Sequence, residues 1–272
     1  MTARTTLKLG VGGLGVIGTA VVDAMRKGIP GLELAAVSAR DRAKAVAVLS
    51  QFDPQPAVVP LSELAHLADV VLECATAAAY DELAWPAVES GKIFVTLSSG
   101  ALLERPELLE LARQTGARII VPSGGIVALD GLKAAAESEI HEVKLITRKP
   151  PKSLAGAKYL LERSIDVNAL DRATKVFDGN AREAARAFPA NANVAASISL
   201  AGIGPERTRV EIWADPGIDQ NLQELRVRSK AAEFTIQLAS HPMPENPRTG
   251  SLTLHSTIAT LRALESPLTV GL

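Results

Sequence analysis

The sequence is poor in residues that several classes of protein require. Its 272 residues include one cysteine, Cys74, which excludes an internal disulfide and a multi-cysteine metal site. Aromatic residues make up 3% of the chain, the formal net charge is -1, and no run is rich in Lys or Arg. We therefore expect no surface that neutralises phosphates or stacks bases, and we predict no nucleic-acid partner.

Long apolar runs are also missing. No stretch approaches the roughly 20 apolar residues of a membrane span, and the opening MTARTTLKLG has no apolar segment of signal-peptide length. We therefore predict a cytoplasmic protein with no membrane partner. Nothing resembles a zinc-ligand cluster, so no metal is expected. Cys74 lies in the apolar run DVVLECA and is interpreted as a buried structural thiol.

The first half of the chain alternates apolar runs with helical patterns. The runs lie at 7–12, 32–38, 69–76, 93–99 and 118–124, and the helical patterns at 16–25, 78–91 and 106–116. Strands without polar alternation, separated by helices, indicate a parallel sheet covered on both faces. This α/β pattern predicts a doubly wound Rossmann domain over residues 1–123, which would bind a dinucleotide.

The second half has a different pattern of apolar and polar residues. Apolar and polar residues alternate at 142–149, 207–215, 223–229 and 232–240, with helical stretches at 179–188 and 191–204. Alternation suits a sheet with one wet face, so residues 124–249 are predicted to form an α+β domain for substrate binding and dimerisation. Residues 148–156 are expected to be a loop. The C-terminal helix, about 250–272, is a candidate to pack back on the first domain.

Two overlapping G-x-G-x-x-G patterns lie in GVGGLGVIGTAVVDAM, one beginning at Gly10 and one at Gly13. The first would place its leading glycine inside the strand. The second fits a strand–turn–helix: Gly13 makes the turn, Gly15 lets phosphates approach the backbone, and Gly18 lets the helix pack closely. The helix N-terminus would then receive the pyrophosphate.

The end of the next strand discriminates between cofactors. An NAD site usually has an acidic residue there, whereas an arginine accommodates the 2′-phosphate of NADP. Ala39 occupies the expected position between Ser38 and Arg40, although Asp41 would serve if the register moved by two residues. We favour NADP over NAD, while Arg40 could also belong to the solvated face of a short helix. The predicted cofactor contacts in this half are Gly13, Leu14, Gly15, Val16, Ile17, Gly18, Ser38, Arg40, Ala75 and Thr76.

Four segments further along resemble the L-aspartate dehydrogenase family in order and spacing. They are VPSGGIVALDGLKAA, TRKPPKSL, FPANANVAASISLAGIGPERTRVEIWADP and NPRTGSLTLHSTIATL. The resemblance implies a Rossmann domain, an α+β domain and a homodimer that oxidises L-aspartate with NAD or NADP to iminosuccinate, in some organisms for NAD biosynthesis. It also implies nicotinamide-side contacts at Gly125, where the family often has alanine, and at Asn193.

One position departs from this family. After ADP the family carries N-x-H, with the histidine as its proposed acid/base, whereas this chain has Gln223. An amide cannot shuttle a proton near neutral pH. Gln223 could orient aspartate while another group handles protons, the pocket could serve a different imine, amine or oxo acid, or the chain could bind dinucleotide without catalysis. His241 is the nearest candidate replacement in the sequence.

A dicarboxylate substrate requires cations. Candidates in the resembling segments are Arg148, Lys149, Lys152 and Arg248. Ser98 and Ser99 follow a predicted parallel strand and would face the cofactor crevice, where they could bond the substrate. The predicted substrate contacts are therefore Ser98, Ser99, Lys149 and Lys152, and the predicted catalytic residues are Gln223 and His241.

Overall fold

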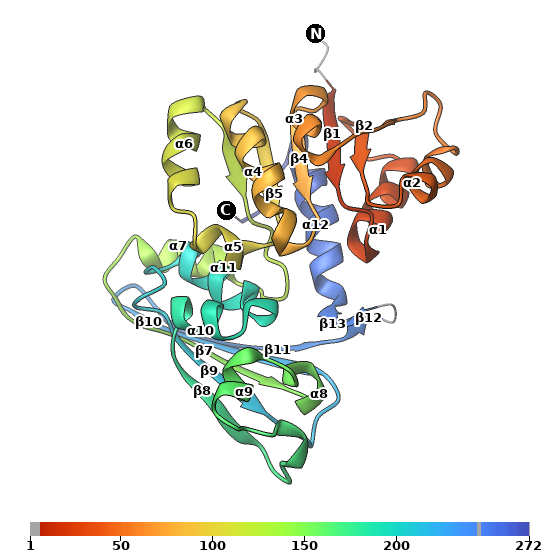
Figure 1. Ribbon diagram of the computed structural model, residues 1–272. Coiled ribbons are helices and arrows are strands. Elements are labelled where there is room, and N and C mark those ends of the chain that lie inside the picture. Colours follow the sequence, from red (N-terminus) through yellow and green to blue (C-terminus); the bar gives the residue numbers. More distant parts are fainter. Residues whose placement is uncertain (1–5, 244–245, 272) are drawn as a thin grey trace. The chain divides into compact units, whose positions relative to one another are not determined.

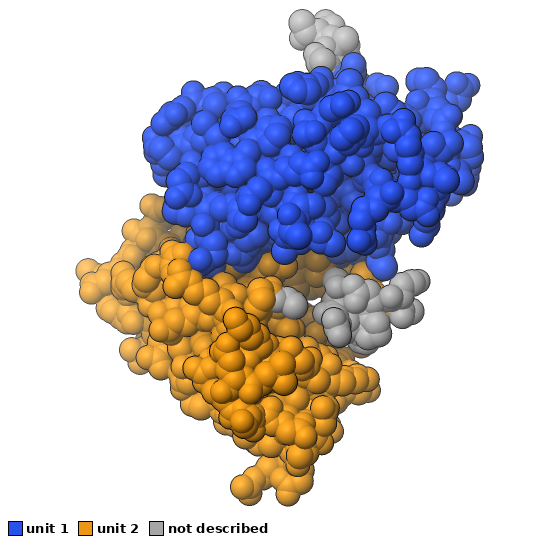
Figure 2. Space-filling view, viewed as in Figure 1, with its two compact units in different colours: residues 1–122, 254–269 blue, residues 123–253, 270–272 orange. Residues whose placement is uncertain are grey.

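The computed structural model describes residues 6–243 and 246–271, which form two compact units. Unit 1 comprises residues 1–122 and 254–269, and unit 2 comprises residues 123–253 and 270–272 (Figures 1 and 2). The chain thus leaves unit 1 after residue 122, returns to it at residue 254, and ends with three residues in unit 2. Each unit has its own sheet and core, and none of the described helices is long and apolar enough to cross a membrane.

Unit 1 is built on a six-stranded parallel sheet in the order β3-β2-β1-β4-β5-β6. Its strands are β1 (Leu7–Gly12), β2 (Leu32–Ser38), β3 (Ala57–Val58), β4 (Val70–Glu73), β5 (Ile93–Thr96) and β6 (Arg118–Ile120). The order reverses between β1 and β4, both of which pair in parallel with their neighbours. Ligands of open α/β sheets bind where the strand order reverses, beyond the carboxyl ends of the strands.

Helices cover both faces of this sheet. One face packs against α1 (Val16–Arg26), α2 (Arg42–Leu49) and α12 (Ser251–Ala263). The other packs against α3 (Leu64–Leu67), α4 (Tyr80–Glu89), α5 (Ser99–Leu103) and α6 (Glu107–Thr115). Adjacent residues of β2 illustrate the alternation, since Ala36 belongs to one core and Val37 to the other. The structure confirms the doubly wound fold predicted for this half.

The helix α12 belongs to the core of unit 1, although it lies at the other end of the sequence. Leu261 is fully buried in the same cluster as Leu9 and Val11 of β1. Ile258 and Leu264 pack against that cluster from the side. The apolar face of the last helix therefore completes the layer that α1 and α2 begin.

Unit 2 holds a five-stranded mixed sheet in the order β11-β10-β7-β9-β8. Its strands are β7 (Ile140–Lys149), β8 (Thr174–Asn180), β9 (Arg209–Ala214), β10 (Asn221–Ser229) and β11 (Glu233–Ser240), and β12 (Pro242–Met243) pairs with β13 (Asn246–Gly250). The central strand β7 runs parallel to β9 and antiparallel to β10. From Val143 in β7 and from Gln223 in β10, every second residue is buried, which matches the predicted sheet with one solvent-exposed face.

The helices of unit 2 gather on the buried face of this sheet. They are α7 (Leu129–Ala136), α8 (Pro151–Leu154), α9 (Lys158–Glu162), α10 (Ala181–Ala187) and α11 (Asn193–Ala201). The opposite face carries ion pairs, such as Lys144 with Glu211 at 2.9 Å. The α+β architecture predicted for this half is confirmed.

Two local expectations were wrong. The predicted loop at 148–156 contains the end of β7 and the short helix α8, because Pro151 at the first helical position has the backbone angle that a helix needs. The helix expected at 179–188 begins only at Ala181. Gly179 and Asn180 instead end β8, and the Asn180 side chain caps α10 by accepting a hydrogen bond from the Glu183 N–H.

Candidate functional site

The turn between β1 and α1 requires glycine at two positions for steric reasons. Gly13 has a φ of +105°, and a Cβ there would lie 2.6 Å from the Cys74 carbonyl oxygen. A Cβ at Gly18 would overlap the Gly13 carbonyl oxygen, so α1 can lie against the turn only without a side chain there. A Cβ at Gly15 would meet nothing within 4 Å. The backbone at Gly15 is therefore open to a ligand.

The strand ends around this turn are held in register by backbone hydrogen bonds. The Gly13 N–H donates to the Ser38 carbonyl at 2.8 Å, and the Cys74 N–H donates to Gly12 at 2.9 Å. The helix α1 begins at Val16 with no acidic residue in its first turn. Its free N–H groups and positive dipole end suit a phosphate group.

A cavity of about 580 Å³ opens at this turn. It brings together predicted cofactor residues from three strand ends, namely Gly13, Leu14, Gly15, Ser38, Arg40, Ala75 and Thr76. Val16 and Ile17 form the start of α1 instead, and Gly18 lies beneath the turn. The glycine cradle, the open backbone at Gly15 and the cavity together fit a dinucleotide.

The edge of the cavity beyond β2 carries the residues that would meet the ribose. Arg40 and Lys44 line the cavity and are exposed to solvent. The Asp41 carboxylate, the alternative ribose acceptor, accepts a hydrogen bond from the Lys44 N–H at 2.9 Å and so caps α2. Asp41 therefore already has a structural role, whereas Arg40 is exposed and makes no hydrogen bond or ion pair with the residues that the structure describes.

A buried carboxylate, Glu73, ties β4 to the loop that follows β5. One Glu73 oxygen accepts from the Thr96 hydroxyl at 3.0 Å and from the N–H groups of Leu97 and Ser98 at 3.1 and 3.0 Å. Its other oxygen accepts from the Ser98 hydroxyl at 3.2 Å. Burial raises the pKa of Glu73, while these bonds oppose the shift. The Ser98 hydroxyl hydrogen is thus directed to Glu73, and the neighbouring Ser99 is buried.

Cys74, next to Glu73, is half-buried and lines the dinucleotide cavity rather than lying wholly inside the core. Lost hydration and the Glu73 charge raise the pKa of its thiol. A thiol that stays protonated is a poor nucleophile. The structure therefore gives Cys74 no catalytic role.

In unit 2, polar groups converge on the buried face of the sheet, where β7 ends and β10 begins. Thr147 is paired across the strands with Gln223, and Lys149 and Asn221 lie one step further along the same face. Buried oxygens of Thr147, Asn221 and Gln223 have no hydrogen-bond partner. Lys149 is 6% exposed, and burial lowers the pKa of its amine to about 8. We call these four residues the strand-end cluster.

Thr147 and Gln223 also line a hollow of about 10 Å³ beneath α10 and α11. That volume suits about one water molecule and not a substrate. Lys149 and Asn221 do not line this hollow.

The other cations predicted for substrate lie elsewhere in unit 2. Arg148 is on the opposite face of β7, 3.8 Å from Asp215 and stacked on Trp213. Lys152 is exposed on α8, and His241 is exposed directly after β11. The side chain of Arg248 lies outside the described part of the chain.

Gly125 and Asn193, the two positions predicted to contact the nicotinamide side, are close to one another within unit 2. A Cβ at Gly125 would lie 3.4 Å from the side chain of Val194, which follows Asn193 at the start of α11. This is ordinary contact distance, so the alanine often found in the family would fit here. Asn193 is exposed.

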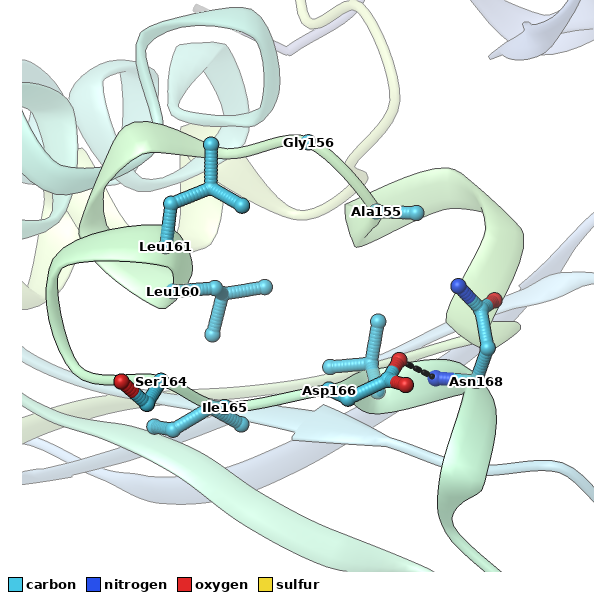
Figure 3. Close-up of a pocket in the computed structure, with 9 residues that line it drawn as sticks. Ala155, Gly156, Leu160, Leu161, Ser164, Ile165, Asp166 and Asn168 are labelled. Carbon is cyan, nitrogen blue, oxygen red and sulfur yellow. Dashed lines mark hydrogen bonds between the residues drawn. The ribbon is translucent and has the colours of Figure 1, made fainter.

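A further hollow of about 300 Å³ lies among α8, α9 and the turn at Val167–Ala169. Figure 3 shows that apolar side chains such as Leu160, Leu161 and Ile165 line it. Its one titratable group, Asp166, accepts a hydrogen bond from the Asn168 N–H at 2.9 Å. A single carboxylate in that role gives this hollow no evident chemistry.

Sequence reasoning missed Glu73, Thr147 and Asn221. Glu73 carried a signal, because a carboxylate ends an otherwise apolar strand, VVLE. Thr147 carried none, because its significance depends on which strands pair, and the signal for Asn221 was its place at the start of the N-x-H motif. Metal ligation was not expected, and no group of three metal-ligating side chains converges in the described residues.

The chain is similar over its whole length to known enzymes. A family model described as "Aspartate dehydrogenase, C-terminal" matches residues 130–264, and one described as "Homoserine dehydrogenase, NAD binding domain" matches residues 13–122. The L-aspartate dehydrogenase of Bradyrhizobium diazoefficiens is 44% identical over 99% of this chain and 96% of its own. That of Methanosarcina barkeri is 38% identical over 97% and 99%.

A solved structure agrees with these sequence matches. The crystal structure of aspartate dehydrogenase from Thermotoga maritima matches with a TM-score of 0.72 at 27% identity, covering 97% of this chain and 99% of that one. The similarity thus extends through both units.

Proposed function

The chain belongs to the L-aspartate dehydrogenase family, and we propose that it oxidises L-aspartate with a nicotinamide dinucleotide to iminosuccinate. Water then converts iminosuccinate to oxaloacetate and ammonia. The observation that carries this proposal is the pairing of two features in one chain. Unit 1 has a glycine-turn cavity that fits a dinucleotide, and unit 2 has a buried polar cluster without partners.

The residues of unit 1 would bind and orient the cofactor. The N–H groups at the start of α1 would receive the pyrophosphate, with Gly15 leaving room for its approach. Glu73 fixes the loop containing Ser98 at the carboxyl end of β5, where we place the nicotinamide side of the crevice. When bound, the dinucleotide supplies the acceptor for the hydride that leaves the substrate Cα.

The residues of unit 2 would hold the substrate. We propose Lys149 and Gln223 of the strand-end cluster as substrate contacts, with Lys152, Ser98 and Ser99 as further candidates. Positioning and exclusion of water are what hydride transfer chiefly needs from a protein. The burial of Lys149 and Gln223 supports such a role.

We further propose that NADP is preferred over NAD and that the protein acts as a homodimer in the cytoplasm. Arg40 lines the cavity, while Asp41 is engaged as a helix cap, which supports the NADP preference. The homodimer follows the family resemblance, and the cytoplasmic location is the expectation from the sequence. Light scattering of the purified chain tests the dimer.

An assay of dinucleotide reduction at 340 nm with L-aspartate, and of the reverse reaction with oxaloacetate and ammonia, tests the activity. We expect turnover on the order of 1–10³ per second with aspartate. Gln223 favours one alternative, because an amide at a substrate contact could match another small amine or oxo acid. Turnover of such a compound at a rate far above that of aspartate would replace aspartate as the substrate.

A further inference from the structure

The strand-end cluster combines a buried amine with oxygens that lack donors. The paired positions Thr147 and Gln223 place their side chains on one face, and Lys149 ends β7 on that face beside Ala214 of β9. Among the described residues, none accepts a hydrogen bond from the Lys149 Nζ. A buried ammonium group without an anion destabilises a fold, so such a group signals a functional site.

A buried water molecule would provide hydrogen-bond partners for only two of the four residues of this cluster. The 10 Å³ hollow is lined by Thr147 and Gln223, and a water there could bond both. Asn221 and Lys149 do not line it. The Asn221 oxygen therefore needs a hydrogen-bond donor, and the Lys149 amine, when neutral, can take a proton from the same donor group.

An amino-acid substrate has such a group. Its α-nitrogen is an ammonium group in neutral water, and that group must lose a proton before its lone pair can form the C=N bond. We propose that the Lys149 amine accepts this proton, while the Asn221 and Gln223 oxygens accept the remaining N–H bonds of the substrate. This inference rests on the proposed function and names the proton acceptor for it.

No other group is as well placed. Thr147, Asn221 and Gln223 do not titrate near neutral pH. The charged neighbours of Lys149 are Arg148, which precedes it in the chain, and Asp215, whose N–H donates to the Lys149 carbonyl. These two side chains pair with each other on the opposite face. Lys152 of α8 and His241 after β11 are exposed, and burial alone lowers the pKa of Lys149. At a pKa of about 8, a substantial fraction of its amine is neutral in mildly basic solution.

The step balances as follows. The ammonium group of aspartate gives one proton to the neutral Lys149 amine, which becomes ammonium. The hydride leaves Cα for the oxidised dinucleotide, and the nitrogen lone pair forms the protonated imine. Water adds to that carbon, ammonium leaves and oxaloacetate remains. Lys149 then releases its proton to solvent, which is the one proton of the overall reaction.

Three variants test the assignment: Lys149→Arg, Lys149→Met and, as a matched control on the wet face of β7, Lys144→Arg. Arginine keeps the positive charge but cannot accept a proton at these pH values. We expect kcat to fall about 10²- to 10⁴-fold in both Lys149 variants and to stay at the parent value in Lys144→Arg. The parent kcat should rise with pH to a plateau above about 8, and this rise should disappear in Lys149→Arg.

Calorimetric binding of succinate, which lacks the amine, provides a readout independent of turnover. If Lys149 acts as the proton acceptor, succinate affinity in Lys149→Arg should stay within about threefold of the parent, because succinate has no amine to be deprotonated. Added methylamine should restore part of the rate of Lys149→Ala by supplying the missing base. Parent-like kcat and pH dependence in Lys149→Arg would overturn the assignment while leaving the proposed function intact. A parent that oxidises no aspartate between pH 6 and 10 would overturn both.

Discussion

Arg40 is the residue on which we propose that cofactor choice depends. It lines the dinucleotide cavity beyond the end of β2, where an arginine accommodates the 2′-phosphate in NADP sites. We expect Arg40→Ala to weaken NADP binding by about 1.5–3 kcal/mol, the loss of a charged hydrogen bond, and to change NAD binding little. Fluorescence titration with both reduced cofactors measures this. Arg42→Ala is the control, since Arg42 is exposed on α2 but does not line the cavity. Equal losses for both cofactors in Arg40→Ala would remove the basis for NADP preference.

The burial of Lys149 predicts an effect on the stability of the fold that does not depend on its proposed role as proton acceptor. Its pKa falls from 10.5 to about 8 on folding, so at pH 7 the folded state carries the full penalty of a buried charge. Between about 8 and 10.5 the unfolded chain still holds the proton that the folded chain has released, and stability rises with pH. Lys149→Met should therefore stabilise the protein at pH 7 by up to about 3 kcal/mol, and the gain should vanish above pH 10.5. Urea unfolding at pH 7 and 10 would reveal an error if Lys149→Met were equally stabilising at both.

Only some residues of the strand-end cluster could be predicted from the sequence. Lys149 and Gln223 were identified because they stand in recognisable motifs. Thr147 was not, because β7 and β10 are far apart in the sequence and only their pairing places Thr147 beside Gln223. Asn221 belongs to the same motif as Gln223, but its unpartnered oxygen could be seen only in the structure. Alternation reveals which face of a strand is buried, but it does not reveal the partner strand or its register.

The turn between β1 and α1 uses its glycines in two different ways, and two alanine variants should separate them. Gly18→Ala forces a methyl group onto the Gly13 carbonyl, so we expect it to destabilise unit 1 by about 1–3 kcal/mol.

In Gly15→Ala the added methyl group meets no protein atom, and the Gly15 φ of −74° is open to alanine. This variant should leave stability within about 1 kcal/mol but weaken dinucleotide binding about tenfold or more, since the methyl group would occupy the path of the phosphates. Thermal unfolding and cofactor titration measure the two effects. Strong binding by Gly15→Ala would place the pyrophosphate elsewhere.

This turn was also the element that the sequence predicted best. Strand, glycine spacing and helix are all local, and the steric demands at Gly13 and Gly18 leave few other solutions. The strand β8 was missed for an equally local reason. Its last residues, Asp178, Gly179 and Asn180, are typical of turns and helix caps, and only pairing with β9 holds them in a strand.

The chain as a whole returns to its first unit through α12, so that unit is incomplete without the C-terminal residues. Leu261→Ala should destabilise unit 1 by about 2–5 kcal/mol, the usual loss for a fully buried leucine. Leu268→Ala is a matched control, because Leu268 is 71% exposed and its loss should change stability by less than about 0.5 kcal/mol. Thermal unfolding with and without dinucleotide measures both variants. Similar melting temperatures for Leu261→Ala and the parent would contradict this packing.

Because α12 packs in the core of unit 1, dinucleotide binding should also protect backbone amides of α12, although α12 does not line the cavity. None of the residues that line the cavity belongs to α12, yet Leu261 shares its core with β1, whose end forms the glycine turn. A dinucleotide at 100 times its dissociation constant stabilises the unit that binds it by about 2.7 kcal/mol. Backbone hydrogens of α12 that exchange with deuterium only when unit 1 opens should then exchange roughly 100-fold more slowly. Deuterium uptake near the C-terminus would thus report occupancy of a site built by the first half of the sequence.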